Sequence, residues 1–203
     1  MLEVKRWNCA VIVLGFLVVL FGCAKPPDSE LTAAKNALEE ARNAGAADYV
    51  FDEVKAVQDD LQKAQEEINA QETRFALARN YDKARELLGK AKAEAEKVKT
   101  DAVSAKENAK GEAETGFKKA QAALDQAKVL LAQAPTGKGS KGDIAALKGD
   151  VQTAEAMLLN IKTALDHGDY LDAMAKEQSV KEMAATVSEQ VKHAMEKTGK
   201  AKK

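Results

Sequence analysis

The spacing of the apolar residues constrains the fold of this chain more than any other feature. From Ser29 onward, apolar side chains recur at alternating intervals of three and four residues. In one series they occupy positions 54, 57, 61, 64, 68, 75 and 78, whereas the positions one residue further on, from Lys55 to Glu72, are polar. An apolar stripe beside a polar stripe is the pattern of an amphipathic helix. The sequence therefore predicts an all-α protein.

Turn-forming residues divide the predicted helices. A new apolar series starts at Leu77, so the phase of the apolar spacing changes near Asn80 and predicts a break there. We also expect Gly111 and Gly116 to loosen the helix in the middle of the chain. Glycine and proline also predict three further breaks, at residues 45–48, 135–142 and 167–169.

The helical part looks duplicated. Tyr81 and Tyr170 lie 89 residues apart, and each follows a predicted turn. We therefore predict one helical repeat over residues 29–112 and a second over residues 113–199, followed by a short basic tail at residues 200–203. Each repeat would hold a short helix, a loop and two longer helices, which together form an antiparallel bundle of about six helices.

The amino-terminal segment has the parts of a secretory signal peptide. Lys5 and Arg6 precede an unbroken apolar run from Cys9 to Phe21. A helix of that length spans about 20 Å, which is short of the roughly 30 Å hydrocarbon core of a bilayer. We therefore expect residues 1–22 to be a cleaved signal peptide.

The apolar run ends in Leu20, Phe21, Gly22 and Cys23, a tetrapeptide that resembles the lipobox of bacterial lipoproteins. Leu20 and Gly22 fit the motif, and Phe21 is bulkier than usual at a loosely specified position. The resemblance implies recognition of these residues by signal peptidase, a diacylglycerol on Cys23, cleavage after Gly22 and acylation of the new amino group. The alternatives are an ordinary signal peptide and an uncleaved membrane anchor, and both leave the placement of the cysteine to coincidence.

Residues 23–28 would then be the lipidated cysteine and its tether, stiffened by Pro26 and Pro27. In lipoproteins of double-membraned bacteria, Ala24 in place of Asp implies sorting to the outer membrane, facing the periplasm. In a host with one membrane, the expected location is the outer face of the cell membrane.

The helical body carries a weaker resemblance. Each predicted turn is followed by Tyr-x-x-Ala, at Tyr81 and at Tyr170, which resembles tetratricopeptide-type hairpins. Residues 29–110 are also similar to small, Ala-rich helical domains of unknown function found in bacterial envelope lipoproteins. That family has no assigned catalytic residues to carry over.

We find no pattern of residues that predicts catalysis. His167 lies beside Asp166, Asp169 and Asp172, but only the last two share a helical face, and Asp169 is needed as a helix cap. His193 lies among lysines. We therefore expect no enzyme, no metal and no cofactor other than the lipid on Cys23. A net charge of -1 with interspersed signs also argues against nucleic acid as a partner.

The expected function is that of a membrane-anchored helical spacer or docking scaffold for envelope proteins or peptidoglycan. Tyr81 and Tyr170 are the candidate partner-binding residues, unless these rings only fill the ends of the bundle. Self-association could cover exposed apolar stripes. One alternative is a lipoprotein that holds a small apolar ligand or lipid between its helices. Another, by resemblance to murein lipoproteins, is covalent attachment of Lys203 to peptidoglycan, although the chain lacks their uninterrupted short heptads.

Overall fold

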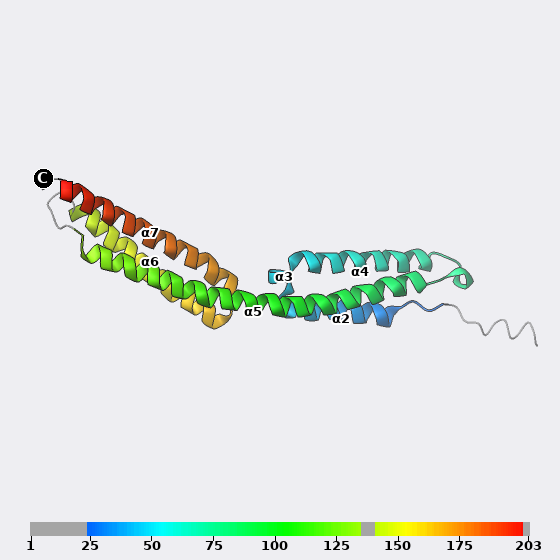
Figure 1. The fold of residues 1–203 in the computed structure, drawn as a ribbon. Helices are drawn as coiled ribbons and strands as arrows, with labels where there is room; N and C mark the ends of the chain where they lie inside the picture. The colour runs from blue at the N-terminus through cyan, green and yellow to red at the C-terminus, as the bar shows by residue number, and fades with distance from the viewer. Residues whose placement is uncertain (1–23, 135–140, 201–203) are drawn as a thin grey trace, which may run out of the picture. The chain divides into compact units, whose positions relative to one another are not determined.

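The computed structural model describes residues 24–134 and 141–200, and every regular element in these ranges is helical (Figure 1). The prediction of an all-α protein is confirmed. The elements are α2 (Asp28–Asn43), α3 (Ala46–Tyr49), α4 (Phe51–Glu72), the 3-10 helix η1 (Ala76–Ala78), α5 (Asp82–Ala132), α6 (Lys141–His167) and α7 (Tyr170–Lys200). Within the described ranges, no helix combines the length and the apolar content that a membrane crossing needs.

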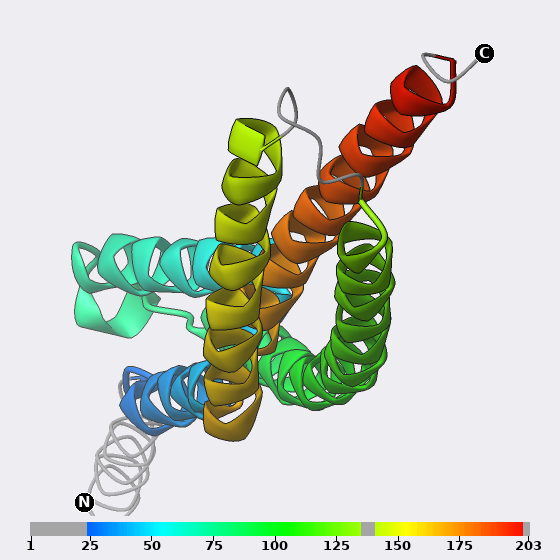
Figure 2. The same cartoon turned by 90° about the vertical axis from the view of Figure 1, so that its left-hand side faces the viewer.

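The chain divides into two compact units, the first ending at Val103 and the second beginning at Ser104. The first unit contains α2, α3, α4 and the beginning of α5, and the second contains the rest of α5 with α6 and α7. Each unit has its own hydrophobic core. In the second unit, α6 and α7 lie side by side (Figure 2).

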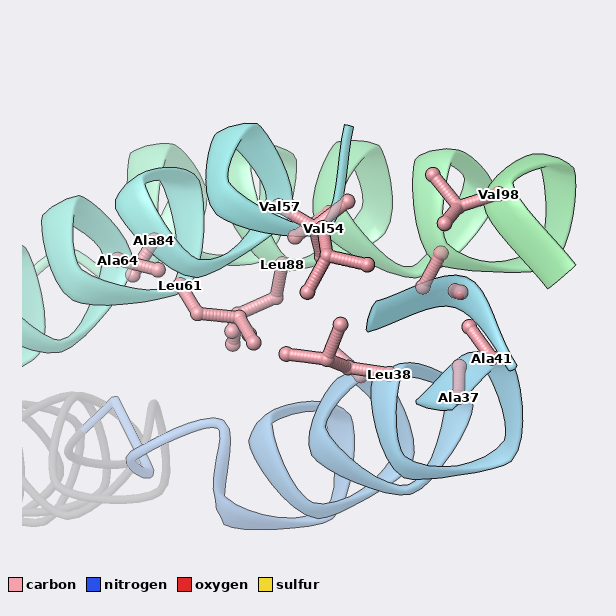
Figure 3. Close-up of a cluster of buried hydrophobic side chains, with 14 of the residues drawn as sticks. Ala37, Leu38, Ala41, Val54, Val57, Leu61, Ala64, Ala84, Leu88 and Val98 are labelled. Carbon is pink, nitrogen blue, oxygen red and sulfur yellow. The ribbon is translucent and has the colours of Figure 1, made fainter. Parts of the chain in front are cut away.

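The core of the first unit is built from the predicted apolar stripes. Leu38 of α2, Leu61 of α4 and Leu88 of α5 converge there, and alanines let the helices approach closely (Figure 3). The break predicted at residues 45–48 begins at Gly45, whose φ of 94° favours glycine, and the single turn of α3 follows it. Gly168, with a φ of 81°, separates α6 from α7 as predicted.

The predicted loosening at Gly111 and Gly116 is wrong, because α5 runs through both glycines as one helix of 51 residues. A glycine in a helix interior costs only about 1 kcal/mol relative to alanine. The buried stripe continues across this region at Ala109, Ala113 and Ala120, so packing on one face outweighs that cost.

The apolar spacing around Asn80 predicts that Phe75 and Leu77 belong to buried stripes. This prediction is wrong, because α4 ends at Glu72 and α5 begins only at Asp82. The side chains of Phe75 and Leu77 lie in the connection between these helices and are 75% and 74% exposed.

Candidate functional site

The described chain begins with the tether that follows Cys23, and this tether lies against the first unit. Ala24 packs on the hydrophobic core, and the side chain of Pro27 is fully buried. The backbone oxygen of Lys25 accepts a 3.1 Å hydrogen bond from Nη2 of Arg85. The chain is therefore held on the helical body from Ala24 onward.

Arg85 connects three segments of the first unit. It lies in the first turn of α5, where its Nη1 is 3.6 Å from Oδ1 of Asp82. Its Nε is 3.5 Å from Oε1 of Glu30 in the first turn of α2. The pKa of Glu30 is lowered, first by the hydroxyl of Ser29 and further by Arg85. Arg85 thus joins the tether, α2 and α5 at one end of the unit.

The same end of the unit carries the connection between α4 and α5, residues 73–80, which we call the α4–α5 turn. Arg79 donates from Nε to the backbone oxygen of Arg74 at 3.1 Å and from Nη2 to that of Glu72 at 2.8 Å. Oδ1 of Asn80 accepts the backbone N–H of Asp82 at 2.7 Å. These bonds satisfy backbone groups at the end of α4 and the start of α5, so they order the turn.

The predicted lipidation residue Cys23 lies outside the described residues, and so do Leu20, Phe21 and Gly22. Lipid attachment therefore stays a prediction.

The two candidate partner-binding tyrosines have different surroundings. Tyr81 is fully buried immediately before α5, and its hydroxyl has no hydrogen-bond partner in the described part of the chain. Tyr170 begins α7, is half-buried and packs on the core of the second unit. Of these two residues only Tyr170 is partly exposed to solvent, and partner binding at either residue stays a prediction.

Asp60 of α4 is a buried carboxylate that links α4 to α5. Its Oδ1 accepts a 2.9 Å hydrogen bond from Nζ of Lys63, and its Oδ2 accepts one of 2.7 Å from Nζ of Lys90. These two bonds lower the pKa of Asp60 from 3.8 to about 2, and the bond from Lys63 has the larger effect. Asp60 is therefore charged at neutral pH and holds the two helices together.

A second buried carboxylate, Glu177 of α7, packs on α5 at Gly116. A Cβ at Gly116 would lie 1.7 Å from Oε2 of Glu177, so only glycine permits this approach. Burial raises the pKa of Glu177, although the charge of Lys181 and a hydrogen bond from the backbone of Phe117 act in the opposite direction. Oε1 has no hydrogen-bond partner among the described residues.

Glu177 also lines a cleft of about 710 Å³ within the second unit. The lining is mostly polar or charged, with Glu107, Asn108, Glu112, Lys119, Gln178 and Lys181 among its residues. Such a cleft can accept hydrogen bonds from a polar group, and its lining does not suit an apolar ligand.

Histidine and carboxylate groups form no metal centre in the part of the chain that the structure describes. No three His, Cys, Asp or Glu side chains gather there in an arrangement that could hold an ion. His167 ends α6, and Asp169 lies between α6 and α7.

Sequence reasoning missed two of these features. Glu177 occupies a position of the apolar stripe of α7, between Ala173 and Val180, and a charge at that position was a usable signal. The hydrogen bond between Arg85 and Lys25 joins residues that are 60 positions apart, so no local sequence pattern could predict it.

No protein-family model matches the chain, and comparisons with curated proteins and with solved structures return no match either.

Proposed function

We propose that this protein is an envelope lipoprotein, anchored by lipid on Cys23, whose helical body acts as a spacer or docking scaffold. The observation that carries the proposal is the tetrapeptide Leu20 to Cys23 at the end of an apolar run. The residues that follow this tetrapeptide are already in contact with the helical body, since Ala24 packs on the core of the first unit and Pro27 is buried. Lipid on Cys23 would therefore attach the helical body directly to the membrane surface.

Two or three acyl chains would provide lasting attachment, because each buried methylene contributes about 0.8 kcal/mol. The location that follows is the periplasmic face of the outer membrane, or the outer face of the cell membrane in a host with a single membrane. The partners would be envelope proteins or peptidoglycan, and the body would have no catalytic role.

We also propose that the body arose as two tandem repeats of antiparallel helices. The division of the chain into two compact units, each with its own Ala-rich core, supports this. A further support is that Tyr81 immediately precedes α5 and Tyr170 begins α7. The cleft beside Glu177 does not favour the alternative of a bound apolar ligand, because most of its lining residues are polar or charged.

The test compares the wild-type chain with Cys23→Ser by membrane fractionation, mass spectrometry of the amino terminus and in-cell crosslinking. Cys9→Ser is the matched control, because it removes the other cysteine of the chain and leaves the lipobox intact. We expect wild type and Cys9→Ser to be cleaved, acylated and crosslinked to envelope components. Cys23→Ser should stay uncleaved and unacylated.

A processed Cys23→Ser protein that still fractionates with membranes would refute the lipid anchor. A correctly anchored body that crosslinks to no protein and to no peptidoglycan would refute the scaffold role.

A further inference from the structure

The α4–α5 turn presents two large apolar side chains to solvent. Phe75 and Leu77 are 75% and 74% exposed and are separated by one residue. Isolated exposed apolar residues are ordinary, but here two large, mostly exposed apolar side chains lie in one short connection between helices.

Hydrogen bonds between the two ends of the α4–α5 turn hold it in place. Arg79 binds backbone oxygens at the end of α4, and the backbone N–H of Asn80 donates to Oε1 of Gln71 at 3.1 Å. Gln71 itself is buried. Phe75 and Leu77 are therefore presented by an ordered turn, and their burial against a partner requires little further ordering of the backbone.

The turn and the start of the described chain lie at the same end of the first unit (Figures 1 and 2). Arg85, which binds the backbone of Lys25, is in the first turn of α5 and so follows the α4–α5 turn closely. Ala24 packs on the core of this unit, and Cys23 is the residue before it in the sequence. A lipid on Cys23 would therefore enter the bilayer close to this end.

We propose that the α4–α5 turn is a second membrane contact, in which Phe75 and Leu77 insert into the bilayer that holds the lipid of Cys23. This inference rests on the proposed lipid anchor. Apolar tips enter the boundary between headgroups and acyl chains, while the exposed Arg74 next to Phe75 stays at the level of the lipid phosphates.

The anchor supplies what the turn lacks. Two apolar side chains alone bind a membrane weakly, but the lipid on Cys23 keeps them at high local concentration beside it. Two contacts at one end also fix the orientation of the first unit. The carboxyl end of α4 faces the bilayer, and Phe51 at its other end lies about 30 Å further along the helix.

The test uses tryptophan as a depth probe in the full-length lipoprotein, purified from membranes and reconstituted into vesicles. The only tryptophan of the chain is Trp7, in the predicted signal peptide. Trp7→Phe ensures that no fluorescence comes from this residue if the signal peptide is not removed. In that background Phe75→Trp reports on the turn. Phe51→Trp is the matched control, because Phe51 is also aromatic and 63% exposed but lies at the opposite end of α4.

The vesicles contain phosphatidylglycerol and phosphatidylcholine whose acyl chains carry bromine, which quenches tryptophan on contact. We expect the emission of the Phe75→Trp protein to shift to shorter wavelength and to lose most of its intensity. The emission of the Phe51→Trp protein should stay as it is in water.

Each outcome separates this inference from the anchor itself. A chain that mass spectrometry shows to be acylated, with Trp at position 75 unquenched, refutes the membrane contact and leaves the anchor intact. Quenching at both positions means that α4 lies flat on the bilayer and also refutes the proposal. Quenching at position 75 in a chain that mass spectrometry shows to lack lipid on Cys23 would refute the anchor, and with it the proposal that the turn depends on that lipid.

Discussion

Replacing Asp60 by asparagine tests how the first unit is held together. Asp60 is charged and buried, and Lys63 of α4 and Lys90 of α5 both bind its carboxylate. Asp60→Asn keeps the size of the side chain but removes the charge that attracts both ammonium groups.

The magnitude follows from the pKa of Asp60. The two lysines lower it from 3.8 to about 2, and one pKa unit corresponds to about 1.4 kcal/mol. The charged form therefore stabilises the folded state by about 2.5 kcal/mol at most. The side chains of Lys63 and Lys90 are 61% and 58% exposed, so solvent weakens the attraction. We expect Asp60→Asn to lower the free energy of unfolding at pH 7 by about 1–2 kcal/mol.

The sign of the pH dependence is also determined. Because the pKa of Asp60 is lower in the folded state, its contribution is present above pH 3.8 and is lost as the pH falls through about 2. Wild type should lose this part of its stability on acidification, and Asp60→Asn should not.

Urea unfolding followed by circular dichroism at a series of pH values measures both effects. Hydrogen exchange of the α4 amides identifies the transition of the first unit. The control is Asp59→Asn, which removes an exposed charge from the same helix and should change stability by less than about 0.5 kcal/mol. Equal losses for the two variants at pH 7, or parallel pH curves for wild type and Asp60→Asn, would refute the reasoning.

Three further predictions concern the second unit and the tether. Glu177→Gln should raise the urea stability of the second unit at pH 7 by roughly 1 kcal/mol, because burial raises the pKa of Glu177. Wild-type stability should fall as the pH rises above 4.5, the ordinary value, and the variant should lack this fall. Gly111→Ala should stabilise α5 by about 1 kcal/mol, since the new Cβ would meet no other part of the described chain within 4 Å beyond the adjoining helix backbone. Gly116→Ala must displace Glu177 and should gain less. Equal gains in thermal unfolding would contradict this. Arg85→Ala should lower the NMR order parameter of Lys25, and an unchanged value would mean that the bond from Arg85 does not hold the tether.

The sequence by itself determined the helical class and most helix ends. The three-and-four spacing of apolar residues needs only local information, because it follows from the geometry of a single helix. The break after Asn43 at Gly45 and the turn at Gly168 were equally predictable, since few residues other than glycine adopt a positive φ.

Only the tertiary structure decided where the apolar stripes end and which residues pack against them. Phe75 and Leu77 continue the apolar spacing, yet α4 ends before them and the turn is held by Arg79 and Asn80. Gly116 predicted a loosened helix, but it provides the space that Glu177 occupies.

The docking of the tether shows the same limit. It depends on Arg85 meeting the backbone of Lys25, and the two residues are 60 positions apart. Periodicity shows which face of a helix is apolar, because that property repeats along the chain. It cannot show which distant residue will cover that face or bind a given polar group, because those contacts exist only once the helices have packed.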